Sequence, residues 1–374
     1  MKITISKESL KGETRVAMTP DAVKRLVSQE IQIAIESGAG DKSYYPDSAF
    51  ASAGAQVAES SKELYQDASI VLRVHPPEKQ EISSLPENAV LISFLNILRT
   101  PELAKELAAQ KVTSFAMEMV PRISRAQSMD ALSSQASAAG YKAVIVAAKA
   151  AKKFFPMLTT AAGTIAPAKV FIIGAGVAGL QAIATAKRLG AVVEAFDIRA
   201  AAKGEVESLG AKFVQAQLEE DTEAEGGYAK EVSNQGKEKI QETIHQHVAA
   251  ADVVITTAQV PGKKAPLLVT REMIQDMKPG SVVVDMAVEQ GGNCDLSESG
   301  KEIDFNGVTI IGPENLPADM AMHTSQMYAR NLTALLKLLI KENSINLDFE
   351  DEIIKGCCIT HAGEIVHPRV KELL

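Results

Sequence analysis

Residues 169–199 have the sequence KVFIIGAGVAGLQAIATAKRLGAVVEAFDIR, which is typical of a dinucleotide-binding βαβ unit. We expect an apolar strand up to Gly174, a helix after Gly176 and a second strand ending at Asp197. Gly174 would make the tight turn, Gly176 would let the backbone approach a pyrophosphate, and Gly179 would let helix and strand pack closely. The helix N-terminus, including Val177 and Ala178, would then present unpaired N–H groups to the phosphates.

Asp197 indicates which dinucleotide is bound. It lies about 20 residues past the glycines, where a carboxylate accepts hydrogen bonds from the adenosine ribose hydroxyls. The same charge would repel the 2′-phosphate of NADP, so the sequence favours NAD(H). Arg199 points the other way, because an arginine can bind a 2′-phosphate.

A whole domain must precede the βαβ unit, because the chain has 374 residues and this unit begins near its middle. Short β-branched runs alternate there with helical patterns, which indicates a parallel sheet with helices on both faces. The expected strands are Lys2–Ser6, Gln32–Glu36, Ser69–Val74, Ala89–Leu95 and Thr113–Met119. The expected helices are Asp21–Ser28, Ser61–Tyr65 and Pro101–Gln110, with Thr19 as an N-cap before Pro20.

The same alternation continues past the βαβ unit. An Ala-rich helix over Ser133–Ala151 would connect the two halves. Further strands are expected at Lys212–Gln215, Asp252–Thr257, Ser281–Asp285 and Val308–Ile311.

A long amphipathic helix after Gly312 would return the chain to the first domain. We therefore predict an α/β protein with two Rossmann-like, doubly wound parallel-sheet domains and a cofactor cleft between them. The first domain would be discontinuous, comprising residues 1–135 and 325–374, and residues 136–324 would form the NAD-binding Rossmann domain.

Composition excludes several other classes of protein. A net charge of −8 and the absence of Trp argue against nucleic acid as a partner. No apolar stretch is long enough to span a bilayer, and the three cysteines fit free thiols in a reducing compartment, so a cytoplasmic protein is expected. The six histidines lack metal-ligand spacing, and His245 and His247 are expected on a solvated helix face.

One polar segment interrupts the pattern, AQLEEDTEAEGGYAKEVSNQGKEK at residues 216–239. It has too few apolar residues for a core element, so it is expected to be a surface loop. A solvated linker is one interpretation. The other is a lid that closes over a cofactor and excludes water, with Gly226 and Gly227 as hinge and Tyr228 as the contact.

Four further segments carry a family resemblance: KESLKGETRVAMTPDAVKRL (7–26), PRISRAQSMDALSSQ (121–135), ITTAQVPGKKAP (255–266) and VVVDMAVEQGGN (282–293). Together with residues 169–199, they resemble the alanine dehydrogenase and nicotinamide nucleotide transhydrogenase family over essentially the whole chain. RISRAQSMD and GGYAKE resemble the transhydrogenase branch specifically.

The resemblance implies roles for individual residues. Arg122, Gln127, Asp130 and Ser133 would form a polar loop beside the nicotinamide, where Gln127 and Asp130 hold the carboxamide and ribose. Without the resemblance, this loop would be interpreted as a basic turn that caps a helix. The resemblance also implies that Val177 lies near the pyrophosphate and that Asp197, Ile198 and Arg199 surround the adenosine. Gly227 and Tyr228 would belong to a mobile loop that closes over NAD, and Gln259 would lie near the cofactor.

The branch of the family can also be judged from chemistry. An amino-acid dehydrogenase must bind a substrate carboxylate and move a proton, for which the family uses arginine, lysine, histidine and aspartate. This chain keeps Arg15 but has His75, Asn96 and Glu289 in the other three places. Hydride exchange between two nicotinamides needs no proton transfer at the reacting carbons, so positioning and water exclusion suffice.

The resemblance therefore implies a homodimeric NAD(H)-binding component of a proton-translocating transhydrogenase, peripheral to the inner membrane through partner subunits. It would pass hydride directly to NADP(H) held on a partner domain, and a membrane-spanning subunit would couple this to proton movement. Two alternatives remain: an amino-acid dehydrogenase with His75 as base and Arg15 as carboxylate anchor, and a non-catalytic NAD-sensing module.

Overall fold

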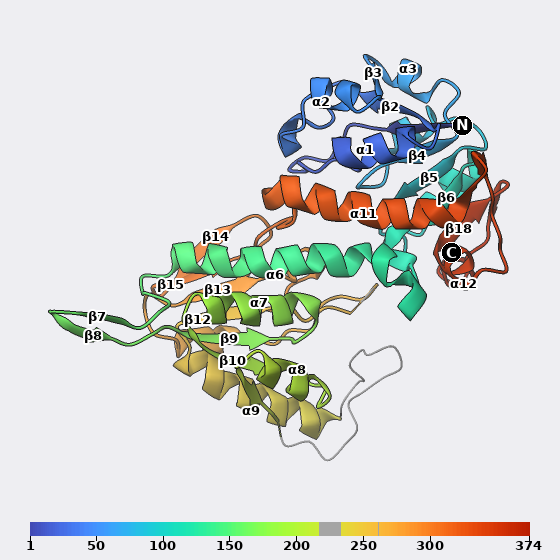
Figure 1. Ribbon diagram of the computed structural model, residues 1–374. Helices are drawn as coiled ribbons and strands as arrows, with labels where there is room; N and C mark the ends of the chain where they lie inside the picture. Colours follow the sequence, from blue (N-terminus) through green and yellow to red (C-terminus); the bar gives the residue numbers. More distant parts are fainter. Residues whose placement is uncertain (217–232, 261) are drawn as a thin grey trace. The chain divides into compact units, whose positions relative to one another are not determined.

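The computed structural model describes residues 1–216, 233–260 and 262–374, and the chain divides into two compact α/β units (Figure 1). The first unit consists of Met1–Gln135 and Pro317–Leu374, and the second of Ala136–Leu316. The division falls within the long helix α6 (Ala131–Ala150), at the position where the sequence predicts a connecting helix.

The first unit is built on an eight-stranded sheet with the order β19-β18-β6-β5-β4-β1-β2-β3. Strands β1 to β6 are parallel, whereas β18 and β19 are antiparallel additions at the edge beside β6. The strands are β1 (Lys2–Ile5), β2 (Gln32–Glu36), β3 (Gln56–Ala58), β4 (Ile70–Leu72), β5 (Val90–Ser93), β6 (Thr113–Ala116), β18 (Cys358–His361) and β19 (Glu364–Ile365).

Helices cover both faces of this sheet, as a doubly wound fold requires. The helices are α1 (Pro20–Val27), α2 (Asp47–Ser52), α3 (Ser61–Tyr65), α4 (Lys79–Ile82), α5 (Glu102–Ala109), α11 (Ala321–Leu339), α12 (Glu352–Cys357) and α13 (Pro368–Lys371). Short 3₁₀ turns lie at η1 (Asp41–Ser43), η2 (Met117–Met119), η3 (Ser124–Met129) and η5 (Ala318–Met320), and β16 (Ile340–Lys341) pairs with β17 (Ser344–Ile345).

Alternating side chains of the strands enter two separate cores. Ile3, Ile5 and Ile35 pack on one face against apolar residues of α1, α11 and α12. Val71 and Leu91 pack on the other face against residues of α3, α4 and α5. The helix α11 therefore belongs to the core of the first unit, although it comes from the C-terminal part of the chain.

The second unit has a seven-stranded sheet with the order β11-β10-β9-β12-β13-β15-β14, in which the strand order reverses direction between β9 and β12. All strands are parallel except the edge strand β14. The strands are β9 (Lys169–Ile173), β10 (Val192–Phe196), β11 (Lys212–Val214), β12 (Val253–Thr256), β13 (Val282–Asp285), β14 (Glu302–Phe305) and β15 (Val308–Ile311).

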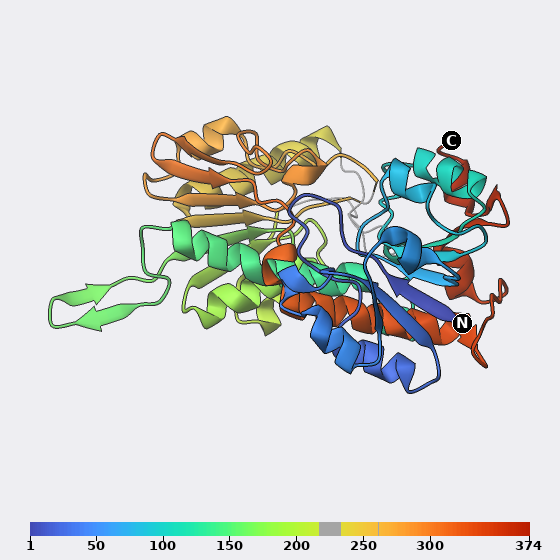
Figure 2. The ribbon, with the colours of Figure 1, turned by 90° about the horizontal axis from the view of Figure 1, so that it is seen from above.

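Two layers of helices enclose this sheet (Figure 2). Apolar residues of α6 and α7 (Val177–Arg188) share one core, and those of α9 (Asn234–Ala250) and α10 (Arg271–Gln275) share the other. The remaining elements are α8 (Ala202–Ser208), η4 (Val288–Gln290) and a hairpin of β7 (Leu158–Thr160) and β8 (Gly163–Ile165) that projects from the unit in both views.

The predicted α/β class, with two doubly wound domains, is confirmed, and most expected elements occur within a few residues of their predicted bounds. Thr19 is the N-cap of α1 before Pro20, as expected, although its side chain makes no capping hydrogen bond. Three local expectations were wrong. The antiparallel edge strands were not foreseen, residues 234–239 begin α9 instead of ending a loop, and His247 is half-buried against Phe171 and Glu194. Within the described residues, no helix has the length and apolarity needed to cross a bilayer.

The three cysteines are free thiols, as expected, and all are buried. Burial raises the pKa of the Cys294 and Cys358 thiols to about 12, so neither carries thiolate at neutral pH. Their positions in the cores indicate packing rather than chemistry.

Candidate functional site

The glycine turn lies at the carboxyl end of β9, where the strand order of the second unit reverses. Gly174 has a φ of 101°, and a Cβ there would lie 2.5 Å from Oγ1 of Thr257. A Cβ on Gly179 would lie 1.8 Å from the carbonyl oxygen of Gly174, so helix α7 can pack against the turn only without a side chain at this position. Both glycines therefore have the mechanical roles that the sequence predicts.

Gly176 differs from these two glycines. A Cβ built there meets no atom within 4 Å, so the position is open toward the outside of the turn. It is the N-cap of α7, whose first-turn amides have no acceptor within the helix. The 12-residue helix also directs the positive end of its dipole at this space. This arrangement suits the close approach of an anion such as a pyrophosphate.

Asp197 follows β10 and is nearly buried, at 9% exposure. Its Oδ2 accepts a 2.7 Å hydrogen bond from the amide of Ala175, inside the glycine turn. Its two oxygens also accept hydrogen bonds of 2.9 Å from the backbone amide, Nε and Nη2 of Arg199. The carboxylate is therefore held rigidly, and its charge is paired with the guanidinium of Arg199.

A network of hydrogen bonds joins the turns after β12 and β13. Asn293 accepts from the amide of Ala258 at 3.0 Å and donates to the carbonyls of Ala258 and Pro266. Asp285, fully buried, accepts from Thr256 Oγ1 at 2.8 Å and from the amide of Asn293 at 2.9 Å. These contacts fix the second wall of the crevice that a nucleotide enters in this fold.

This network was not predicted from the sequence. VVVDMAVEQGGN contains Asp285 and Asn293, but their partners are separated from them in sequence, so spacing gives no signal. Gln259, which was predicted to lie near the cofactor, is exposed. Its side chain donates a hydrogen bond to the carbonyl of Met286 at 3.0 Å and accepts one from Gln290. It therefore extends the same connection between the two turns.

The second group of predicted residues lies in the first unit, around η3 and the start of α6. Asp130 accepts hydrogen bonds from the backbone amide and the hydroxyl of Ser133, at 2.8 and 2.6 Å. Asp130 thus caps α6, as the interpretation without the family resemblance expects. Gln127 and Arg122 are exposed, and the η3 turn is anchored to α11 by a 2.9 Å bond from Asn331 to the carbonyl of Ser128.

The structure thus brings the predicted residues together in two groups. Gly174, Gly176, Val177, Ala178, Gly179, Asp197, Ile198 and Arg199 surround the turn of the second unit. Gln127, Asp130 and Ser133 lie within seven consecutive residues of the first unit, and Arg122 precedes Gln127 by five residues. Gly227 and Tyr228 lie outside the described residues.

Arg15 and His75, two of the positions compared with amino-acid dehydrogenases, form a buried cluster with Glu13. Glu13 Oε1 and Oε2 accept from Arg15 Nε and Nη2 at 2.8 and 2.6 Å, and Oε2 lies 2.6 Å from His75 Nε2. Burial by itself would raise the pKa of Glu13, but the hydrogen bonds from Arg15 and His75 outweigh it and hold that pKa below its usual range. Arg15 and His75 are therefore already engaged with a carboxylate of the chain itself.

Asn96, the third of those positions, occupies an exposed turn after β5 with a φ of 51°. The carboxylate of Glu118 accepts hydrogen bonds from the amides of Leu95 and Ile97, at 3.0 Å each for the shorter contacts. Burial nevertheless raises the pKa of Glu118. This anchoring shapes the turn, and an amide side chain at its tip offers no acid or base for proton transfer.

Family models match nearly the whole chain: "Alanine dehydrogenase/PNT, N-terminal domain" at residues 4–139 and "Alanine dehydrogenase/PNT, C-terminal domain" at residues 143–368. NAD(P) transhydrogenase subunit alpha of Haemophilus influenzae is 44% identical over 371 residues, covering 98% of this chain and 72% of its own. The crystal structure of transhydrogenase from Sinorhizobium meliloti superimposes with a TM-score of 0.86 at 44% identity, covering 98% of this chain and 99% of that one.

Alanine dehydrogenase of Bacillus subtilis is more distant, at 32% identity over 350 residues, covering 91% of this chain and 85% of its own. The family resemblance found in the sequence is confirmed by these matches. The higher identity to transhydrogenase subunits agrees with the changed residues at positions 75, 96 and 289.

We predict that Gly179→Ala destabilises the second unit by about 2 kcal/mol or more, because the added methyl group overlaps a backbone oxygen that cannot move independently. Gly204→Ala is the matched control: Gly204 lies in α8, and its Cβ would meet no atom within 4 Å. That change should leave stability the same or raise it by about 0.5–1 kcal/mol. Urea unfolding measures both, and equal stabilities for the two variants would contradict the packing argument.

Proposed function

Because the chain belongs to the alanine dehydrogenase/PNT family, we propose that it is the NAD(H)-binding component of a proton-translocating transhydrogenase. It exchanges hydride directly between NAD(H) and NADP(H) held on a partner domain. The observation that carries this proposal is the Asp197 carboxylate fixed against the glycine turn, since it selects NAD(H) without supplying acid or base chemistry.

In this proposal, residues of the second unit would bind each part of the dinucleotide except its reactive end. The amides at the start of α7, at Val177 and Ala178, would donate to the pyrophosphate, and Gly176 leaves room for it. Asp197 would accept from the adenosine ribose hydroxyls, with Ile198 beside the adenine. Since a carboxylate has about four lone-pair positions and Ala175 and Arg199 already use them, the Arg199 side chain must release a bond when the ribose binds.

Residues of the first unit would contact the reactive nicotinamide end. Gln127 and Asp130 would hold the carboxamide and ribose, and Arg122 and Ser133 would belong to the same polar loop, as the family resemblance implies. The bound cofactor supplies the hydride, and these side chains supply orientation. Asp130 is prepared for this by Ser133, which holds both carboxylate oxygens in place. Orientation is the main requirement of hydride transfer, because no proton is moved at the reacting carbons.

The amino-acid dehydrogenase alternative loses support for a physical reason. Arg15 is engaged with Glu13 and with Gln135 Oε1 at 2.8 Å, and His75 Nε2 lies 2.6 Å from the same Glu13 carboxylate. The groups that would anchor a substrate carboxylate therefore already bind Glu13. No observation favours the NAD-sensing alternative over catalysis.

Proton movement would occur in a membrane-spanning partner subunit, and this chain would be cytoplasmic and peripheral to the membrane through that partner. We also propose a homodimer joined through the β7–β8 hairpin. A two-stranded hairpin is not stable by itself in water. This one exposes Met157 to 63% and Ile165 to 50%, which is typical of a surface covered by another chain.

The central experiment mixes the purified chain with NADH and NADP⁺, with and without an isolated NADP-binding domain of transhydrogenase. We expect NADH binding in both cases but NADPH formation only when the partner domain is present. Gln127→Ala should lower the rate of transfer by about 100-fold because the ring is no longer oriented. Gln29→Ala, at an exposed amide just after α1, is the control and should change nothing.

Two outcomes of that experiment would contradict the proposal. One is strong NADPH formation by the chain alone, and the other is oxidation of alanine with NAD⁺ at a comparable rate. Full NADH binding with no transfer beside the partner domain would favour the NAD-sensing module instead.

The hairpin makes a separate prediction. Met157→Asp should weaken dimerisation by at least about tenfold, because a charge would be buried in an apolar contact. Leu373→Asp, at a residue 50% exposed near the C-terminus, is the control. Sedimentation velocity over a range of concentrations measures both, and a dimer unaffected by Met157→Asp would show that the hairpin does not hold the copies together.

A further inference from the structure

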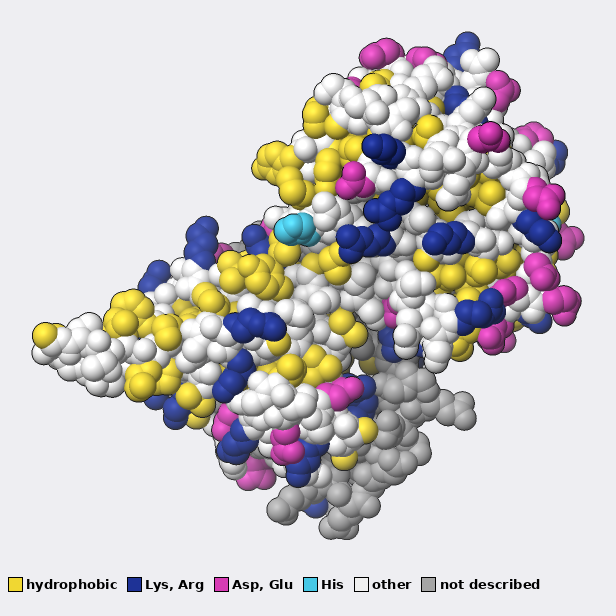
Figure 3. All heavy atoms as spheres, in the orientation of Figure 1, with side chains coloured by type: hydrophobic (Ala, Val, Ile, Leu, Met, Phe, Trp, Pro, Cys, Tyr) yellow, Lys and Arg dark blue, Asp and Glu magenta, His cyan; other side chains and the backbone are white. Residues whose placement is uncertain are grey.

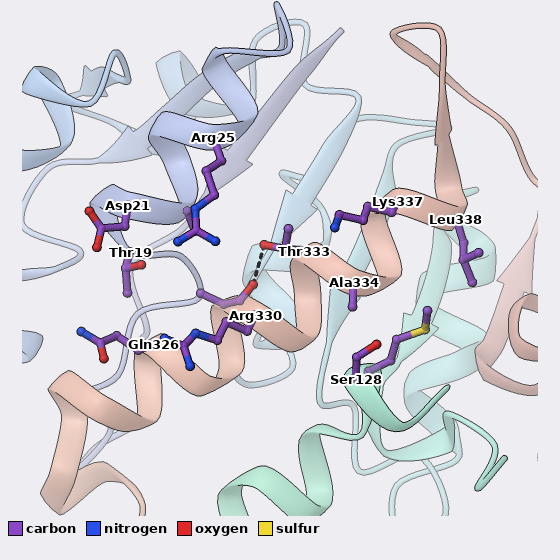
Figure 4. A pocket seen from close by; sticks show the side chains of 13 residues that line it. Thr19, Asp21, Arg25, Ser128, Gln326, Arg330, Thr333, Ala334, Lys337 and Leu338 are labelled. Carbon is purple, nitrogen blue, oxygen red and sulfur yellow. Dashed lines mark hydrogen bonds between the residues drawn. The ribbon is translucent and has the colours of Figure 1, made fainter. Parts of the chain in front are cut away.

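The first unit contains a cavity of about 490 Å³. Its lining includes none of the residues predicted to bind a nucleotide, although Ser128 and Met129 lie between Gln127 and Asp130 in sequence. It lies among α1, the η3 turn and α11 (Figure 4). Its lining has an apolar part and a polar part. The residues are Thr19, Asp21, Ala22, Arg25, Ser128, Met129, Gln326, Ala329, Arg330, Thr333, Ala334, Lys337 and Leu338.

The charge of this cavity is unusual for the protein. The lining contains three cations, Arg25, Arg330 and Lys337, and one carboxylate, Asp21. Its formal charge is therefore +2, in a chain of net charge −8. Cationic side chains also gather over α1 and α11 on the surface (Figure 3). A local reversal of sign of this kind concentrates anions at one place on an acidic protein.

The three cations lie close to few acidic groups within the described residues. Some exposed cations of the first unit are paired with carboxylates, as in Lys79 with Glu106 at 3.0 Å and Arg125 with Asp351 at 2.6 Å. Across the described ranges, no ion pair involves Arg25, Arg330 or Lys337. Their donors are therefore available to a ligand.

The cations are arranged along a groove. Arg25 extends from α1 toward α11, and Lys337 and Arg330 project from α11 into the same space (Figure 4). Arg330 and Lys337 are seven residues apart, so they lie about 10 Å apart along the helix axis. Met129, Ala334 and Leu338 contribute apolar surface to the lining.

We propose that this groove binds a phosphate-bearing ligand. The guanidinium groups of Arg25 and Arg330 match the bidentate geometry of phosphate oxygens, and Lys337 adds a point charge further along. The formal charge of +2 on the lining balances a phosphate monoester, which carries about −1.5 to −2 at neutral pH. The cavity volume and the apolar lining leave room for the organic part of such a ligand. This inference does not depend on the function of the nucleotide site.

The test is a calorimetric titration with inorganic pyrophosphate at low salt, together with cosedimentation on phosphatidylcholine vesicles with and without phosphatidylglycerol. The first arm detects a soluble phosphate ligand, and the second detects a phospholipid headgroup. Arg25→Gln and Arg330→Gln should each weaken binding by about tenfold, since each removes a charge-assisted hydrogen bond.

Two exposed cations outside the groove provide matched controls. Arg369→Gln in α13 and Lys105→Gln in α5 make the same change of charge and should leave binding unaltered. The groove variants also distinguish the two sites where pyrophosphate could bind. Arg25→Gln and Arg330→Gln would weaken binding in the groove but would not change binding at the glycine turn of the second unit.

Binding of pyrophosphate that both groove variants weaken supports the proposal with a soluble ligand. Binding only to vesicles with phosphatidylglycerol, again lost in the groove variants, supports it with a phospholipid. No binding in either arm would overturn the proposal. Equal binding by the groove variants and the control variants would overturn it as well.

Discussion

The nucleotide site depends on one carboxylate. Asp197 lies at the end of β10, yet its side chain accepts a hydrogen bond from Ala175 in the turn after β9. That bond ties the two strands' loops together and holds the turn in the form that Gly174 and Gly179 permit. A nearly buried charge is tolerable there because Arg199 pairs with it at 2.9 Å. In the proposed function, the residue that holds the turn for the pyrophosphate would also accept hydrogen bonds from the ribose.

This arrangement also explains how little conventional catalytic chemistry the chain requires. The one buried cluster of charged groups that resembles a substrate anchor, Glu13 with Arg15 and His75, satisfies itself internally. Asp130 is similarly occupied by Ser133. Side chains engaged in this way orient ligands well, but they are poorly placed to exchange protons. Transfer of hydride between two bound nucleotides needs only that the ligands be oriented.

The elements that were predicted correctly are those specified by residues close together in the sequence. Residues 169–199 specify a strand, a turn, a helix and a second strand through neighbouring residues, and the structure has β9, α7 and β10 there. The roles of Gly174 and Gly179 were predictable because glycine has few other reasons to occur at those spacings. The strand Gln32–Glu36 and the helix Ser61–Tyr65 agree with their predicted bounds for the same reason.

What could not be predicted depends on contacts between distant residues. The edge strand β18 joins β6 across more than 200 residues of chain, and its short apolar run gives no sign of its partner. Asn293 serves two turns at once, and the pairing of Asp197 with Arg199 depends on side-chain rotamers. The β7–β8 hairpin was missed because its strands have only three residues each.

The proposed function requires that Asp197 make this chain prefer NAD(H). The most direct measurement is a fluorescence titration with NADH and with NADPH, which the absence of Trp favours. We predict that NADH binds about 100-fold more tightly than NADPH, since the 2′-phosphate would lie against a paired but desolvated carboxylate. Asp197→Asn should reduce this preference to less than about tenfold. Equal affinities for the two nucleotides in the unaltered protein, or a preference that survives Asp197→Asn, would contradict the claim.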